Sequence, residues 1–130
     1  MNTDKFITAY YEIRNGTDRF HRNLFYPKFL YSDGVAECAQ AGCYWLLDIL
    51  GTELPTQFKR RQPWDGFCIV KVTVKNESAT ILGEWQDDDP SPWRRKVNYT
   101  DMPEGTWMFY VTPTGTPMDD KYTCILPTEY

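Results

Sequence analysis

The sequence contains a single histidine, His21, and no long apolar run. A mechanism that needs a histidine base must use His21, yet no nucleophile motif accompanies it. No stretch approaches the roughly 20 apolar residues of a membrane-spanning helix. The first residues, Met1 to Lys5, also lack the apolar core of a secretion signal. We therefore expect a cytoplasmic protein that has no membrane partner, no cofactor and no bound metal.

Cysteine pairs with metal-site spacing are missing as well. The four cysteines, Cys38, Cys43, Cys68 and Cys124, include no Cys-x-x-Cys pair of the kind that zinc sites use. Cys38 and Cys43 fall in an expected helix, where their separation of about 7.5 Å along the axis is awkward for a disulfide. Four reduced thiols are the simplest expectation.

Length and composition favour one folded domain over residues 1–130. A chain of 130 residues with 42% hydrophobic and 16% aromatic side chains can remove roughly two-thirds of its unfolded surface from water. Disordered chains are poor in aromatic residues. We expect order nearly throughout.

Two helical regions are predicted in the first half of the chain. From Thr3 to Arg14 apolar residues recur at the spacing of one helical face. A second helix is expected to start at Ser32 or Asp33 and to be interrupted at Gly42. It continues as an almost wholly apolar segment, residues 44–50, that we expect to be the central core helix. Gly51 is predicted to end it, and residues 52–65 to form a loop.

The second half alternates between apolar and polar residues, which indicates strands. The expected strands cover residues 67–74, 79–85, 93–100, 106–112 and 121–126, and residues 18–22 are either a short edge strand or an extended segment. Helices followed by strands are typical of α+β proteins. We predict N-terminal helices packed on one face of a mostly antiparallel sheet of about five strands.

Charge is unevenly distributed along the chain. The net charge is −4, and the acidic excess lies wholly in residues 66–130. Basic residues cluster only at Lys59-Arg60-Arg61 and Arg94-Arg95-Lys96. Nucleic-acid binders rely on a basic footprint, so direct nucleic-acid binding is disfavoured. A partner with a basic surface is favoured instead.

An acidic and aromatic surface is the binding site that the sequence favours. Aromatic side chains concentrate binding energy at protein interfaces, and three tryptophans lie beside acidic turns. The candidate binding residues are Trp85, Asp87, Asp88, Asp89, Trp93 and Trp107. Two simpler interpretations stay open: the tryptophans fill the core, and the acidic turn only improves solubility.

A carboxylate and histidine site is the second candidate. Asp33 and Asp48 are embedded in apolar sequence, and a buried pair with His21 could perform acid and base chemistry. The structural alternative is stronger. In that alternative Asp33 caps a helix, and Asp48 bonds a neighbouring loop or a tyrosine hydroxyl.

Several short motifs resemble those of a known family. The motifs are Gly16 to Arg22, Tyr31 to Val35, Ala41 to Asp48, and the terminal Leu126-Pro127-Thr128-Glu129-Tyr130. They are similar to motifs of a small family of domains of unknown function carried by phages, plasmids and bacterial genomes. The resemblance covers about Gly16 to the C-terminus and leaves out the N-terminal helix. It implies no established activity.

Three functions follow as hypotheses. The first is a non-enzymatic protein that binds a host complex of anti-phage defence and inhibits that complex, by analogy with anti-CRISPR proteins. Its partner would be a host protein or ribonucleoprotein with a basic surface. The alternatives are a small enzyme that uses Asp33, Asp48 and His21, and a nucleic-acid-associated accessory protein whose two basic clusters form one stripe. The sequence leaves the oligomeric state open.

Overall fold

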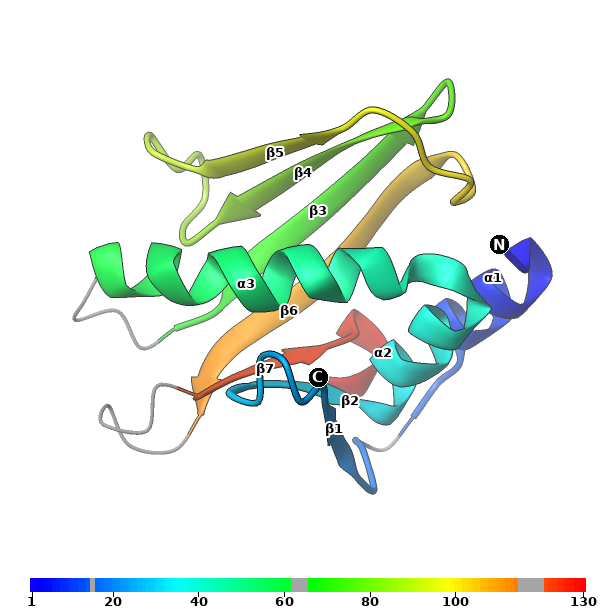
Figure 1. Cartoon of the computed structure of the whole chain (residues 1–130), viewed down its shortest axis with the longest axis horizontal. Coiled ribbons are helices and arrows are strands. Elements are labelled where there is room, and N and C mark those ends of the chain that lie inside the picture. The colour runs from blue at the N-terminus through cyan, green and yellow to red at the C-terminus, as the bar shows by residue number, and fades with distance from the viewer. Residues whose placement is uncertain (15, 62–65, 115–120) are drawn as a thin grey trace.

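The computed structural model describes residues 1–14, 16–61, 66–114 and 121–130, which form an α+β fold (Figure 1). The helical elements are α1 (Thr3–Tyr11), α2 (Asp33–Cys38), the π-helical turn η1 (Ala39–Cys43), α3 (Tyr44–Arg60) and the 3-10 turn η2 (Pro127–Glu129). The strands are β1 (Phe20–Arg22), β2 (Phe29–Ser32), β3 (Cys68–Lys75), β4 (Ser78–Glu84), β5 (Trp93–Val97), β6 (Gly105–Thr114) and β7 (Lys121–Ile125).

The strands form one mixed sheet of seven, in the order β1-β2-β7-β6-β3-β4-β5. The five strands predicted for the second half are present, with bounds that differ from the prediction by a few residues. Strand β1 lies at the edge of the sheet and confirms the edge-strand alternative for residues 18–22, whereas β2 was not predicted. The prediction also missed that β2 runs parallel to β7, with Leu30 opposite Thr123. Strand β2 has only four residues, and its partner β7 is far away in the sequence, so the local sequence carries little sign of it.

Helix α3 extends beyond the predicted end at Gly51 and reaches Arg60. The predicted loop is therefore wrong over residues 52–60, and residues 62–65 lie outside the described part of the chain. Gly51 serves packing, because a Cβ atom there would lie 2.5 Å from the ring of Tyr26. Buried side chains at Leu54 and Phe58 anchor the last turns, so burial overrides the sequence preference for a stop.

The other helix predictions are partly confirmed. Gly42 has a φ of 133° and marks the kink between the two helical regions, as expected. Helix α1 ends at Tyr11 rather than at Arg14, and its N-cap is Asn2, whose side chain accepts a hydrogen bond from the Lys5 amide at 3.0 Å.

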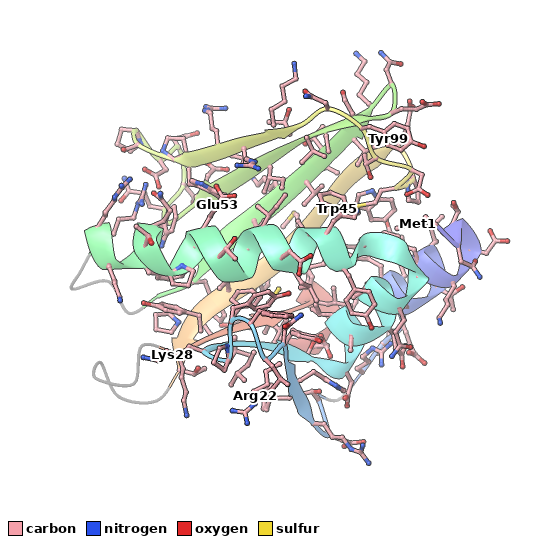
Figure 2. All side chains as sticks on the ribbon, in the orientation of Figure 1. Met1, Arg22, Lys28, Trp45, Glu53 and Tyr99 are labelled. Carbon is pink, nitrogen blue, oxygen red and sulfur yellow. The ribbon has the colours of Figure 1, made fainter. Side chains whose placement is uncertain are left out.

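The core lies between α3 and one face of the sheet, which the helix crosses in Figure 1. The alternating burial of β3, in which Val70 and Val72 are fully buried, identifies this face. Arg95 also projects from β5 on this side and pairs with Glu53 of α3 at 3.2 Å; Figure 2 shows Glu53 on the edge of α3 near β5. The opposite face carries exposed residues such as Thr73 and Thr80.

All four cysteines are free and buried, in agreement with the expectation of reduced thiols. Burial raises the pKa of the Cys43 and Cys68 thiols to about 12. The thiols therefore stay protonated near neutral pH, and they act as small apolar side chains of the core.

Tyr10 provides hydrogen bonds to backbone groups of β6 that no neighbouring strand pairs with on that side. The last pair between β6 and β7 joins Tyr110 to Ile125, so Met108 of β6 lies beyond the end of β7. The Tyr10 hydroxyl accepts a hydrogen bond from the Met108 amide at 2.7 Å and donates one to its carbonyl at 3.1 Å. Tyr10 thus replaces a missing strand at this point.

We expect Tyr10→Phe to lower the free energy of unfolding by about 1–3 kcal/mol, because two part-buried backbone groups lose their partner. Urea denaturation followed by circular dichroism measures the change. Tyr11→Phe is the matched control, since Tyr11 is 61% exposed. Equal stability of the two variants would contradict this role for the hydroxyl.

Candidate binding surface

The start of α2 joins three distant segments of the chain. Ser32 is the N-cap of α2, and its hydroxyl accepts a hydrogen bond from the Val35 amide at 3.3 Å. The carboxylate of Glu129 accepts hydrogen bonds from the Ser32 hydroxyl at 2.5 Å, the Gly34 amide at 3.1 Å and the Leu126 amide at 2.9 Å. A Cβ atom on Gly34 would lie 2.8 Å from Glu129. These contacts fasten the C-terminal turn to the start of α2.

Asp33 extends the same junction towards β1. Its carboxylate contacts His21 Nε2 at 2.9 Å and accepts the amides of Asp18 and Arg19 at 2.9 and 3.4 Å. The Asp33 amide donates to the Thr17 hydroxyl at 2.9 Å. The contact with His21, followed by that with the Asp18 amide, lowers the pKa of Asp33 to about 2. Asp33 therefore orders the segment before β1, while the N-cap role falls to Ser32.

Asp48 makes a different contact from the one that the enzyme hypothesis needs. Its carboxylate accepts a hydrogen bond of 2.5 Å from the Tyr26 hydroxyl. Burial, and then this hydrogen bond, raise the pKa of Tyr26. The structure thus brings His21 and Asp33 together and pairs Asp48 with a tyrosine, which is the structural alternative that the sequence had offered for Asp48.

The three tryptophans of the predicted surface are side chains of the core. Trp85, Trp93 and Trp107 are only 5%, 7% and 5% exposed. Trp107 packs edge-on against Phe6 and Tyr10 of α1, at 5.0 Å between ring centroids in each case. The core-filling interpretation therefore describes their positions. These three side chains are not exposed aromatic contacts for a partner.

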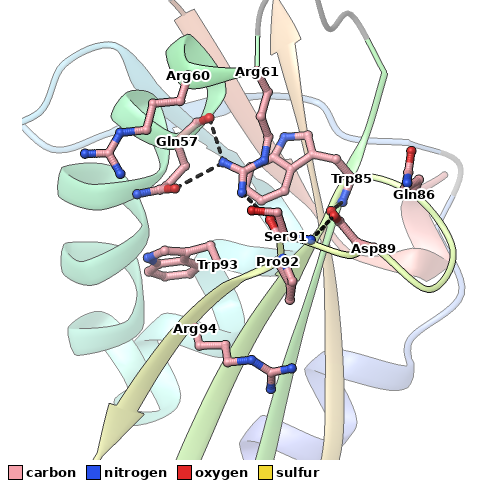
Figure 3. A pocket seen from close by; sticks show the side chains of 10 residues that line it. All are labelled: Gln57, Arg60, Arg61, Trp85, Gln86, Asp89, Ser91, Pro92, Trp93 and Arg94. Carbon is pink, nitrogen blue, oxygen red and sulfur yellow. Dashed lines mark hydrogen bonds between the residues drawn. The ribbon is translucent and has the colours of Figure 1, made fainter.

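Trp85 nevertheless borders the surface, where Arg61 covers its ring (Figure 3). The Arg61 guanidinium lies 3.8 Å from the ring centroid. It donates hydrogen bonds to the backbone and side-chain oxygens of Gln57 at 2.9 and 3.1 Å, and to the Ser91 carbonyl at 2.5 Å. Arg61 thereby ties the end of α3 to the turn after β4. The buried Trp85 indole N–H has no acceptor within the described residues.

Asp89 organises the acidic turn between β4 and β5. Its carboxylate accepts the Trp85 amide at 3.0 Å and the Ser91 amide at 2.9 Å (Figure 3). The hydrogen bond from the Trp85 amide is the main cause that lowers the pKa of Asp89. Asp88 adopts a left-handed backbone with a φ of 50°, which aspartate tolerates better than most residues. Asp87 and Asp88 are exposed on the turn that these hydrogen bonds of Asp89 stabilise.

Two hollows meet at Trp85. We call the first the arginine hollow; it measures about 590 Å³ and is lined by Gln57, Arg60, Arg61, Trp85, Gln86, Asp89, Ser91, Pro92, Trp93 and Arg94. We call the second the acidic groove; it measures about 610 Å³ and is lined by Phe67, Ile69, Lys71, Glu84, Trp85, Gln86, Asp87 and Asp88.

Three residues of the two basic clusters line the arginine hollow. These are Arg60 and Arg61 at the end of α3 and Arg94 at the start of β5. The side chain of Arg94 is directed to the face of the sheet opposite α3, since the next residue, Arg95, pairs with Glu53 of α3. The extension of α3 past Gly51 places Arg60 and Arg61 at this end of the sheet.

Residues 6–130 match the model of a family of unknown function, DUF6876. The chain belongs to this family. The match begins inside α1, so the helix that the motif resemblance left out is part of the family's domain. Comparison with curated proteins and with solved structures found no significant match.

Among the described residues, no group of three or more histidine, cysteine, aspartate or glutamate side chains is placed to hold a metal ion. None of the described helices combines the length and the apolar character needed to cross a membrane.

We predict that Asp33 makes stability depend on pH in the acid range. The folded-state pKa of about 2 lies below the unfolded value of about 3.9. The stabilisation is therefore complete above about pH 4 and is lost as the pH falls through 2. Urea denaturation at several pH values should show Asp33→Asn less stable than the wild type at pH 6, with a difference that shrinks towards pH 2.

Asp18→Asn is the control for this measurement, because Asp18 is exposed and contributes its backbone amide to the junction. A deficit of Asp33→Asn that stays constant between pH 6 and pH 2 would contradict the role assigned to the carboxylate.

Proposed function

We propose that the protein is a non-enzymatic binding protein that recognises a basic surface of a partner through the acidic groove. The observation that carries the proposal is the rigid turn that presents Asp87 and Asp88 beside a preformed hollow. Electrostatic complementarity of this kind selects partners and increases the rate of association. The partner is then a protein or ribonucleoprotein complex with exposed lysine or arginine.

The groove suits a long basic side chain. Phe67, Ile69 and Trp85 supply apolar walls, against which the methylene groups of lysine or arginine can pack. Lys71 and Glu84 form an ion pair at 3.0 Å, so their charges largely offset each other. The charge that remains at the groove comes from Asp87 and Asp88, which a basic head group would neutralise.

The residues of the predicted surface divide into three kinds. Asp87 and Asp88 would contact the partner, and Asp89 would hold the turn. Trp85 would form part of the groove wall. Trp93 and Trp107 are core residues that would make no contact with the partner.

The biological setting belongs to the same proposal. The motif resemblance indicates a family carried by phages, plasmids and bacterial genomes, and small acidic proteins of mobile elements often inhibit host machinery. We propose inhibition of a host anti-phage defence complex, with anti-CRISPR inhibitors as the analogy. The acidic groove is the feature of this chain that suits a basic nucleic-acid channel of such a complex.

The decisive variant is Asp87→Asn/Asp88→Asn. Asparagine keeps the shape of aspartate and tolerates the left-handed backbone of residue 88, so the turn is retained and its charge is lost. Fluorescence anisotropy with a labelled oligo-arginine peptide should show about tenfold weaker binding for this variant, as expected for the loss of about 1.4 kcal/mol. Binding of the wild type should weaken as salt is raised.

Asp4→Asn/Asp18→Asn is the matched control, because it removes two exposed carboxylates in the first half of the chain. Affinity purification from host lysate with the same three proteins should recover one stoichiometric complex with the wild type and the control only. Equal peptide binding by both double variants would show that net charge rather than the groove is responsible, and would refute the proposal.

A further inference from the structure

The face of the sheet opposite α3 carries a group of basic side chains, of which the sequence clusters indicated only Arg94 and Lys96. The register places Lys71 and Arg94 on either side of Leu82, and Thr73 and Lys96 on either side of Thr80. Side chains directly across neighbouring strands share one face. Arg94 and Lys96 of β5 therefore flank β4 on one side, with Lys71 on its other side.

Lys75 completes the group. It lies on β3 two and four positions from Thr73 and Lys71, so it points to the same face. Lys71, Lys75, Arg94 and Lys96 thus surround Thr80 and Leu82, and we call these six residues the basic face. Strands lie about 4.8 Å apart and alternate residues about 6.7 Å apart, so the four charges fit within a single contact area.

Most of this charge is available to a ligand. Lys71 is paired with Glu84 at 3.0 Å. The side chains of Lys75, Arg94 and Lys96 are exposed and have no ion-pair or hydrogen-bond partner within the described residues.

We propose that the basic face binds the phosphodiester backbone of a nucleic acid. Lysine and arginine neutralise phosphates and release their counterions, and threonine hydroxyls such as that of Thr80 are common donors to phosphate oxygens. None of the six residues of the basic face is aromatic, so the basic face itself holds no ring on which a base could stack. Binding is therefore expected to depend on the backbone and to be insensitive to base sequence.

A simpler explanation accounts for only part of the group. Charged residues on an edge strand prevent unwanted pairing with another sheet, and β5 is an edge strand. That explanation covers Arg94 and Lys96. It does not cover Lys71 and Lys75, because β3 is paired on both sides, with β4 and β6.

The net charge of −4 and the acidic excess of residues 66–130 disfavoured nucleic-acid binding, but neither takes account of which face of the sheet a charged side chain occupies. In the folded chain the basic face is adjacent to the acidic groove, with which it shares Lys71. This inference goes beyond the proposed function and uses different side chains. A partner that satisfied both surfaces would be a nucleoprotein, with protein at the groove and nucleic acid at the basic face.

The test uses the full chain and a fluorescein-labelled 20-nucleotide oligo-dT at low salt. Fluorescence anisotropy should show binding whose affinity falls with salt. For Arg94→Ala/Lys96→Ala, the slope of log K against log salt should become about 1.4 shallower, since each phosphate contact on a single strand contributes about 0.7. The affinity should fall at least tenfold. An oligo-dC of equal length should bind within about threefold of oligo-dT, because the contacts are to the backbone.

Arg22→Ala/Lys28→Ala is the matched control, because it removes two positive charges near the opposite edge of the sheet. Urea denaturation verifies that both double variants remain folded. Retained binding in the control supports the basic face. No binding by the wild type, or an equal loss in both variants, overturns it. Because Asp87 and Asp88 are unchanged, oligo-arginine binding by the same proteins reports separately on the acidic groove.

Discussion

The carboxylate of Glu129 links the C-terminal turn to the start of α2 by hydrogen bonds. The first amides of a helix have no partner inside the helix, and Glu129 supplies an acceptor to Gly34 while it also bonds Ser32 and Leu126. The parallel pairing of β2 with β7 brings these residues together from opposite ends of the chain. With Asp33 bound to His21 and to the amides before β1, one junction fixes the order of three strands. His21 and Asp33, two residues of the candidate catalytic group, are thus both part of this junction.

A second junction, built around Trp85, shapes the surface. The ring packs on Phe58 at 5.4 Å in the core and under Arg61 at the surface. Asp89 holds the amide of the same residue. The arginine hollow and the acidic groove therefore share the Trp85 side chain as a wall, and these contacts hold it in place. Preorganised sites of this kind lose less conformational entropy on binding.

Around the turn between β4 and β5, charges of opposite sign lie on neighbouring surfaces. Asp87 and Asp88 project from the turn between β4 and β5, while Arg94 and Lys96 follow on β5 itself. Opposite potentials side by side favour a partner with the complementary pattern over one with a single sign of charge. The net charge is a poor guide to such a surface, because an interaction with a bound group weakens over about one Debye length.

The sequence by itself determined the α+β class, the five strands of the second half, the kink at Gly42 and the acidic turn, because these depend on local periodicity and backbone preference. Only the tertiary structure decided the rest. The parallel strand β2, the extension of α3 past Gly51 and the burial of the three tryptophans all depend on contacts between distant residues. The contact of His21 with Asp33, and the position of Arg60 and Arg94 at one hollow, depend on the same long-range packing, which leaves no periodic trace along the chain.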